Sequence, residues 1–176
     1  MLTEKCKVAI FVSGGGTNLQ AILDSRGEII KNAEICLVAS SSKDAYALER
    51  AKKHDIETFI IEDEQRLVEK LKSLEIDFIV LAGYLRILSE EFCKRYSNRI
   101  INVHPSLIPS FCGKGFYGLK VHEKALEYGV KVSGATVHFV NEIPDGGKII
   151  DQKAVRVHEG DTAEDLQKRV MAEEIG

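Results

Sequence analysis

The feature that most constrains the fold of this chain is a regular alternation of short apolar runs with helical segments. The apolar runs are of strand length, and most of them are apolar throughout and rich in β-branched residues. Such runs are typical of strands that are buried on both faces of a parallel sheet. Because amphipathic segments separate the runs, the pattern predicts an α/β fold with a doubly wound, mostly parallel sheet. The predicted strands of this part are 7–13, 34–40, 57–61, 77–83 and 99–104.

The pattern changes after residue 104. A long loop and a predicted helix over 118–128 lead to two further predicted strands, 132–140 and 147–157. Only a short polar segment separates these strands, so we expect them to pair antiparallel. Asp161 or Thr162 could cap a last helix. Since no linker, repeat or low-complexity tract interrupts the chain, we expect one domain over residues 1–176.

Composition narrows the function classes. An apolar fraction of 44% and a charged fraction of 29% are typical of a soluble globular protein. The net charge of -3 argues against a nucleic-acid partner. The four cysteines are scattered, so they predict neither a disulfide framework nor a metal site. No apolar run approaches the roughly 20 residues of a membrane span and no signal peptide is apparent, so we expect a cytoplasmic protein without a membrane partner.

A glycine-rich turn over 14–18 follows the first predicted strand and begins a helix. Glycines let the backbone approach a ligand, and the free N–H groups of a helix start favour an anion. A dinucleotide turn would have a further glycine at the position of Leu19, and a nucleoside triphosphate loop would have Gly-Lys followed by Ser or Thr. Both are missing. We therefore expect a single phosphate here, and a tight turn without a ligand is the alternative.

Polar side chains end the fifth predicted strand. Asn102 and His104 are two residues apart, so their side chains point to the same face. Pro105 then ends the strand because it has no N–H to donate. Ligands of open α/β sheets bind at such strand ends. The alternative is a polar strand end that is hydrogen-bonded to a neighbouring loop.

Asp145 lies between the last two predicted strands. If its carboxylate is close to His104, it would raise the pKa of the imidazole and make it a proton donor near neutral pH. Asn102 offers an N–H donor of the kind found in oxyanion holes. Ser106 and Cys112 have no base nearby apart from His104. The set therefore favours direct transfer between two bound substrates, through a tetrahedral oxyanion.

Five segments, in this order along the chain, resemble the phosphoribosylglycinamide formyltransferase family. They are Ser-Gly-Gly-Gly-Thr-Asn-Leu-Gln at 13–20, Leu-Ala-Gly-Tyr-Leu-Arg-Ile-Leu at 81–88, Asn-Val-His-Pro-Ser-Leu-Ile-Pro at 102–109, Gly-Ala-Thr-Val-His-Phe-Val at 134–140 and Asp-Gly-Gly at 145–147. Enzymes of this family act in purine synthesis, where they transfer a formyl group from 10-formyltetrahydrofolate to glycinamide ribonucleotide. The resemblance implies these small molecules as substrates, the formyltransferase fold and no metal.

The resemblance also implies roles for residues by position. It implies that Asn102, His104 and Asp145 are the catalytic residues, with His104 as proton donor and oxyanion stabiliser. The residues implied to contact glycinamide ribonucleotide are Gly14, Gly15, Gly16, Thr17, Asn18 and Glu174. The residues implied to bind the folate are Leu85, Arg86, Ile87, Leu88, Asn102, Val140, Asn141, Glu142, Ile143 and Asp145.

Other residues carry weaker expectations. The large apolar residues of the loop 84–88 suit a flat, largely apolar pteridine ring, and Arg86 could meet a folate carboxylate or cap a helix. His138 is expected to be a structural neighbour of the site. The remaining histidines are expected on the surface: His54, His122 and His158.

Two departures from the family pattern and three rival functions remain. The loop 110–118 is longer than in some members, and the family usually continues beyond the last helix, whereas this sequence ends at Gly176.

A formyltetrahydrofolate deformylase resembles this fold but normally carries an extra N-terminal domain. A methionyl-tRNA formyltransferase would need a tRNA-binding domain and a basic surface. A binding module for folate or nucleotide would keep the pockets without the catalytic residues.

Overall fold

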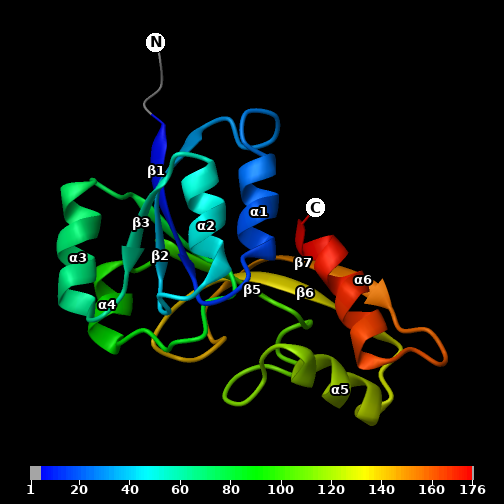
Figure 1. Ribbon diagram of the computed structural model, residues 1–176. Helices are drawn as coiled ribbons and strands as arrows, with labels where there is room; N and C mark the ends of the chain where they lie inside the picture. The colour runs from blue at the N-terminus through cyan, green and yellow to red at the C-terminus, as the bar shows by residue number, and fades with distance from the viewer. Residues whose placement is uncertain (1–4, 176) are drawn as a thin grey trace. The chain divides into compact units, whose positions relative to one another are not determined.

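A computed structural model describes residues 5–175 of the chain (Figure 1). The fold is a seven-stranded mixed sheet, mostly parallel, with antiparallel strands in the C-terminal part and helices that flank it. This confirms the predicted fold class. The chain divides into two compact units, up to Ile100 and from Ile101, and each is described by itself. The prediction of a single domain stays a prediction. In the described part, no helix is long and apolar enough to cross a membrane.

The first unit alternates strands and helices, as its apolar pattern predicts. Its strands pair parallel in the order β3-β2-β1-β4. The strands are β1 (Cys6–Val12), β2 (Ala33–Ser40), β3 (Glu57–Ile60) and β4 (Phe78–Leu81). The helices are α1 (Thr17–Asp24), α2 (Tyr46–Lys53), α3 (Glu64–Ser73) and α4 (Glu90–Arg95).

Two buried layers hold the first unit together. On one side, Leu19 of α1 and Ala47 of α2 pack with Ile10 of β1, and all three are fully buried. Phe11, the next residue of β1, points the other way and lies 6.1 Å from the ring of Phe92 in α4. Because successive strand residues are buried on both sides, helices must cover both faces of this parallel sheet.

The described part of the second unit contains three strands and two helices. The strands β5 (Ile100–His104), β6 (Val132–Phe139) and β7 (Ile149–Arg156) pair antiparallel in this order, as expected for the last two strands. The helices are α5 (Leu119–Tyr128) and α6 (Ala163–Ile175). Ala125 of α5 and Leu166 of α6 pack with Ala135 of β6 in one buried cluster.

The predicted N-terminus of the last helix is confirmed. The N–H of Asp165 donates to Thr162 Oγ1 at 3.2 Å, and the N–H of Thr162 donates to Asp165 Oδ2 at 3.1 Å. This reciprocal pair is a capping box, in which two otherwise unpaired N–H groups of the helix start find acceptors. Thr162, of the two candidates, is therefore the cap, and α6 begins at the next residue.

Candidate active site

The register of β5 against β6 places four polar side chains on one face of the second unit. Asn102 lies opposite His138, and His104 lies opposite Thr136. Directly paired residues of antiparallel strands, and residues two apart on one strand, share a face. His104 and His138 are almost completely buried there, with exposed fractions of 4% and 1%. A buried imidazole needs polar partners, which the neighbouring loops supply.

The turn between β6 and β7 carries Asp145 into this cluster. Gly147 makes the turn possible, since a Cβ atom at this position would lie 1.6 Å from the carbonyl oxygen of Phe139. Asp145 has a positive φ of 53°, a left-handed conformation that Asp tolerates better than most residues. The N–H of Gly113 donates to its Oδ2 atom at 2.8 Å. The loop 110–118 thus helps to hold the carboxylate.

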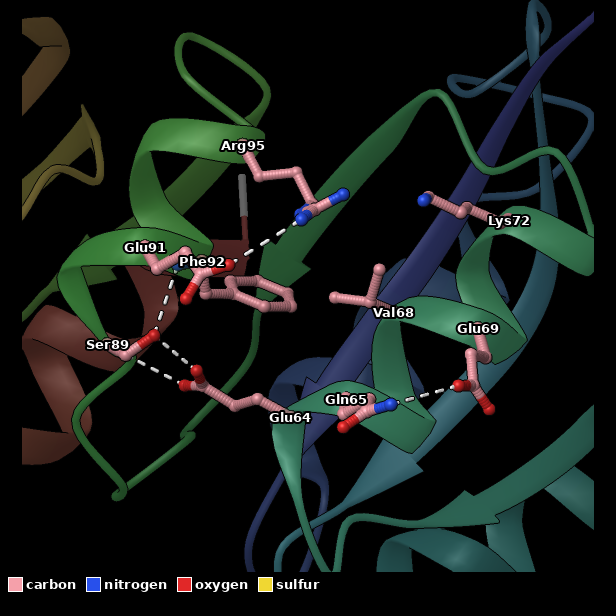
Figure 2. Close-up of a pocket in the computed structure, with 9 residues that line it drawn as sticks. All are labelled: Glu64, Gln65, Val68, Glu69, Lys72, Ser89, Glu91, Phe92 and Arg95. Atoms are coloured by element: carbon pink, nitrogen blue, oxygen red, sulfur yellow. Dashed lines mark hydrogen bonds and ion pairs between the residues drawn. The ribbon is translucent and has the colours of Figure 1, made fainter.

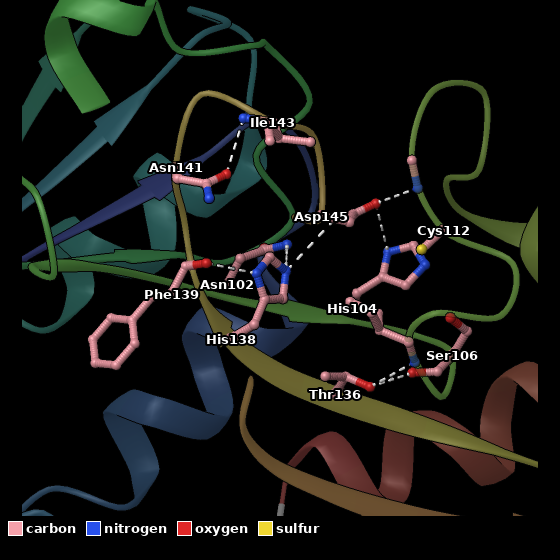
Figure 3. A network of polar contacts seen from close by, with 12 residues as sticks. Asn102, His104, Ser106, Cys112, Thr136, His138, Phe139, Asn141, Ile143 and Asp145 are labelled. Carbon is pink, nitrogen blue, oxygen red and sulfur yellow. Dashed lines mark hydrogen bonds and ion pairs between the residues drawn. The ribbon is translucent and has the colours of Figure 1, made fainter. Parts of the chain in front are cut away.

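Asp145 lies between two imidazole rings, as Figure 3 shows. Its Oδ2 atom is 3.6 Å from Nδ1 of His104, and its Oδ1 atom is 3.6 Å from Nε2 of His138. These distances are longer than hydrogen bonds but short enough for ionic attraction to a protonated ring. The structure therefore brings together the predicted residues Asn102, His104 and Asp145, and adds His138 to them.

Burial by itself would raise the pKa of Asp145. The neighbouring His138, the N–H of Gly113 and the charge of His104 outweigh burial, so that the pKa of this carboxyl lies below its ordinary value. Asp145 is therefore ionised at neutral pH. The cluster therefore holds a fixed negative charge between two buried imidazole rings.

Both ring nitrogens of His104 face acceptors. Nε2 lies 2.8 Å from the carbonyl oxygen of Phe111, which can only accept a hydrogen bond, so Nε2 carries a proton. Nδ1 faces the Asp145 carboxylate. Only a doubly protonated ring could donate toward both acceptors at once.

Sequence reasoning treated His138 as a structural neighbour, and the structure gives it direct contacts with two predicted catalytic residues. Its Nδ1 atom lies 2.9 Å from the carbonyl oxygen of Phe139, to which it can donate a hydrogen bond. Its Nε2 atom lies 3.4 Å from Nδ2 of Asn102 and 3.6 Å from Oδ1 of Asp145. The register of β6 against β5, which the sequence alone does not fix, places His138 opposite Asn102.

Two possible nucleophiles near His104 donate hydrogen bonds to backbone carbonyl oxygens instead of facing its ring. Ser106 is fully buried and its hydroxyl donates to the carbonyl oxygen of Ser110 at 2.5 Å. The Cys112 thiol donates to the carbonyl oxygen of Pro109, and burial, followed by the Asp145 carboxylate, raises its pKa. Neither group is an activated nucleophile. The cluster suits a reaction in which a substrate supplies the attacking atom.

The expectation that His122 lies on the surface is wrong. This residue of α5 is only 1% exposed, and its Nδ1 atom has no hydrogen-bond partner among the described residues. Burial, followed by the charge of His104, lowers the pKa of His122 to about 4. The helix turns this position inward beside Val121 and Ala125, so the apolar spacing of the helix was a better guide than the polarity of the side chain. His158 is exposed as expected, and His54 is partly buried.

The glycine turn of the first unit links β1 to α1. Gly16 has a φ of 76°, and a Cβ atom there would lie 2.7 Å from Cβ of Ala47. Only glycine fits this position without strain. Thr17 and Asn18 form the first turn of α1, which contains no acidic residue. The N–H groups of this helix start are thus donors in a locally non-acidic setting, as an anion site requires.

Two predicted folate loops, one in each unit, expose apolar side chains. In the first unit, Leu85 is 70% and Ile87 is 81% exposed, while Leu88 is buried. Arg86 donates to the carbonyl oxygen of Ile61 at 3.0 Å. In the second unit, Ile143 is 59% exposed, and its N–H donates to Oδ1 of Asn141 in the same turn. Val140 is partly buried and Glu142 exposed. Exposed apolar side chains of this size fit a flat apolar ligand.

Glu174 lies near the end of α6 and lines a pocket of about 200 Å³ in the second unit. Val103 and Val137, which alternate along their strands with the polar cluster residues, line the same pocket. Among the described residues, no cluster of three or more His, Cys, Asp or Glu side chains could hold a metal ion.

A larger groove of about 420 Å³ lies between α3 and α4 in the first unit (Figure 2). None of the sequence motifs points to this groove. Glu64 lies at one end, where it accepts from the N–H of Ser89 at 2.8 Å and from the Ser89 hydroxyl. Val68 and Phe92 supply the apolar part of the lining. None of the predicted substrate residues lines this groove.

A family model described as formyl transferase matches residues 6–175. The chain is 41% identical to a chloroplastic phosphoribosylglycinamide formyltransferase of Arabidopsis thaliana, over 96% of the chain and 61% of the relative. It is 39% identical to phosphoribosylglycinamide formyltransferase of Haemophilus influenzae, over 96% of the chain and 81% of the relative. The chain thus spans about three-fifths of the plant relative.

Solved structures agree. The crystal structure of phosphoribosylglycinamide formyltransferase from Anaplasma phagocytophilum matches with a TM-score of 0.90 and 36% identity, over 98% of this chain and 82% of that one. A formyltetrahydrofolate deformylase from Pseudomonas syringae matches with a TM-score of 0.86 and 28% identity, over 98% of this chain and 58% of that one. The fold is therefore shared by proteins named for two different reactions.

Proposed function

Because the chain belongs to the formyl transferase family, we propose that it transfers the formyl group of 10-formyltetrahydrofolate to the amine of glycinamide ribonucleotide. The observation that carries the proposal is the ionised Asp145 between the buried rings of His104 and His138. Such a cluster can stabilise an oxyanion and move a proton, but it has no activated nucleophile of its own. An amine that attacks the formyl carbon directly supplies what the cluster lacks.

The proposed reaction moves one proton from the amine to the leaving folate nitrogen, in two transfers through His104. A bond forms between the amine nitrogen and the formyl carbon, and the bond from this carbon to the folate nitrogen breaks. The leaving nitrogen takes a proton from His104, and the proton that the amine loses restores the ring. In the tetrahedral intermediate, N–H groups of His104 and Asn102 stabilise the oxyanion. Asp145 stabilises the positive charge on the His104 ring.

The carbonyl oxygen of Phe111 bears on this proposal. It lies 2.8 Å from Nε2 of His104, the distance at which a substrate oxyanion would accept the same hydrogen bond. The carbonyl oxygen therefore stands in for the substrate oxygen. In our proposal, the substrate oxygen replaces the carbonyl oxygen of Phe111 at Nε2 of His104 when the substrates bind, and the loop 110–118 moves away with Phe111.

We further propose the substrate contacts from the family resemblance. The N–H groups of Gly14–Asn18 would hold the phosphate of the nucleotide, and Glu174 would contact the same substrate. Leu85–Leu88 and Val140–Asp145 would bind the folate, and their exposed apolar side chains support this role. The cytoplasmic location expected from the sequence stays a prediction.

The main rival is hydrolysis of 10-formyltetrahydrofolate, because a deformylase shares the fold. The two functions differ in what attacks the formyl carbon, an amine or water. The test is release of tetrahydrofolate by the purified protein with and without glycinamide ribonucleotide. We expect release that depends on the amine and matches the formylated product one to one. Release at the same rate without the amine would favour the deformylase, and binding without any release would favour a binding module.

A further inference from the structure

Arg50 of α2 contacts the glycine turn of the first unit, and neither the sequence motifs nor the proposed function assigns it a role. Its Nε–H donates to the carbonyl oxygen of Gly15 at 2.8 Å, and an Nη1–H donates to Oε1 of Gln20 in α1 at 3.1 Å. Its guanidinium carbon lies 5.0 Å from the centre of the Tyr46 ring. These contacts fix the planar group over the Tyr46 ring and against the turn and α1.

The turn is fixed from the side of α2. The N–H of Ala47 donates to the carbonyl oxygen of Gly14 at 3.0 Å, and Arg50 takes up the carbonyl oxygen of the next residue, Gly15. Ala47 and Arg50 are three residues apart, so they lie on the same face of the helix. Two successive carbonyl groups are therefore held by α2. The N–H groups at the start of α1 remain as the donors for a ligand, since they have no partner within the helix.

The positive charge of Arg50 also favours a phosphate beside the turn. A carbonyl oxygen near a phosphate repels it, and a hydrogen bond from a guanidinium offsets this repulsion. Arg50 uses two of its N–H groups in contacts with described residues, and no carboxylate is among its partners. Its positive charge is therefore not cancelled by an ion pair in the part of the chain that the structure describes.

We propose that Arg50 is a positioning residue for the phosphate monoester of the nucleotide substrate, because it holds the Gly14–Gly16 turn and places an uncancelled positive charge beside it. This inference rests on the proposed function and adds to it the residue that makes the turn selective for a phosphorylated amine. Arg50 touches the turn and not the reacting atoms, so its effect should appear in substrate binding rather than in the chemical step.

The test compares Arg50→Met and Arg50→Lys with the unchanged protein. We expect Arg50→Met to raise the KM for glycinamide ribonucleotide about tenfold, the size of a lost charge-assisted contact, with kcat changed less than about twofold. The KM for 10-formyltetrahydrofolate should not change. Arg50→Lys keeps the charge but not the fork of donors, so it should lie between the two.

A dephosphorylated substrate distinguishes the phosphate role from a merely structural one. With glycinamide ribonucleoside, which lacks the phosphate, kcat/KM of Arg50→Met should match that of the unchanged protein within about twofold. Arg26→Met is the matched control, since Arg26 is bonded to Leu23 and His54 rather than to the turn. A tenfold defect that persists with the ribonucleoside, or that appears in Arg26→Met, would overturn the proposal.

Calorimetric binding of glycinamide ribonucleotide separates this proposal from the function on which it rests. Binding constants do not depend on turnover, so they measure the effect of Arg50 even if the unchanged protein transfers no formyl group. Tight binding without transfer would contradict the proposed function alone. Equal binding constants of the unchanged protein and both Arg50 variants would contradict the inference about Arg50 alone.

Discussion

The glycine turn of the first unit and the polar cluster of the second unit are built from different parts of the chain. In the turn, the groups available to a ligand are backbone N–H groups, and the neighbouring helix α2 holds the backbone in place. In the cluster, the available groups are side chains, and backbone atoms of Phe111, Gly113 and Phe139 hold them. The turn thus presents backbone groups to a ligand, whereas the cluster presents side chains.

This difference determines which substitutions each region tolerates. A backbone site depends on conformation, so it is sensitive to any added Cβ atom at a crowded position. A side-chain site depends on the chemical identity of its residues, so an isosteric change can remove function and leave the fold intact. The two regions should therefore fail in different ways, through stability in the first unit and through activity in the second.

Of the substitutions that test this comparison of the two regions, Asp145→Asn should have the largest effect. Asn tolerates the positive φ of this position and keeps an oxygen that can accept from the N–H of Gly113. It lacks the negative charge, so formyl transfer should fall by about a thousandfold, within the range for proton-transfer groups. Steady-state kinetics and urea unfolding measure the two effects. If unfolding changes by several kcal/mol while transfer is kept, the second unit does not behave as a side-chain site.

Gly16→Ala should be the most destabilising change in the first unit. The added Cβ atom would lie 2.7 Å from Cβ of Ala47, and the φ of 76° disfavours any L side chain. We expect a loss of about 3 kcal/mol in the free energy of unfolding. Gly14→Ala is the matched control, since a Cβ atom added at Gly14 would have no neighbour within 4 Å among the described residues, and the φ of Gly14 is not positive. Equal losses of unfolding free energy in Gly16→Ala and Gly14→Ala would contradict the view that the turn depends on its backbone conformation at Gly16.

The stability of the second unit should depend on pH through His122. Its folded pKa of about 4 lies below the ordinary value of about 6.5, so between these values the unfolded chain binds a proton that the folded chain does not. Stability should therefore fall by about 2 to 3 kcal/mol as the pH decreases from 7 to 4. His122→Leu should remove this part of the pH dependence in urea unfolding, and the exposed His158→Leu should not. If the free energy of unfolding of His122→Leu depended on pH as strongly as that of the unchanged protein, His122 would not be the source of this pH dependence.

Ser13→Ala should have the smallest effect. The Ser13 hydroxyl accepts from the N–H of Leu85 at 2.9 Å and shares a hydrogen bond with Ser41 at 2.6 Å. Its loss should cost about 1 kcal/mol in the free energy of unfolding. A loss larger than that of Gly16→Ala would mean that side-chain contacts, and not backbone conformation, dominate the loop ends of the first unit.

Sequence patterns were sufficient to predict the strands and helices, but they predicted only part of the site. Apolar runs predicted the strands of the first unit and β5, and the spacing of Asn102 and His104 placed them on one face, because strand periodicity is local. The contact of Asp145 with His104 depends on the antiparallel register and on the close approach at Gly147, and the residues alone do not fix either. The same limit explains why the backbone contacts of Phe111 and Gly113 were missed.

The most direct test of the account is His104→Ala, measured for formyl transfer and for binding of each substrate, with His158→Ala as the control on an exposed histidine. We expect His104→Ala to lose nearly all transfer, by about a thousandfold or more, while the dissociation constants of both substrates change less than about threefold. Transfer that persists at the rate of the unchanged protein would contradict the proposal that the buried imidazole cluster performs the reaction.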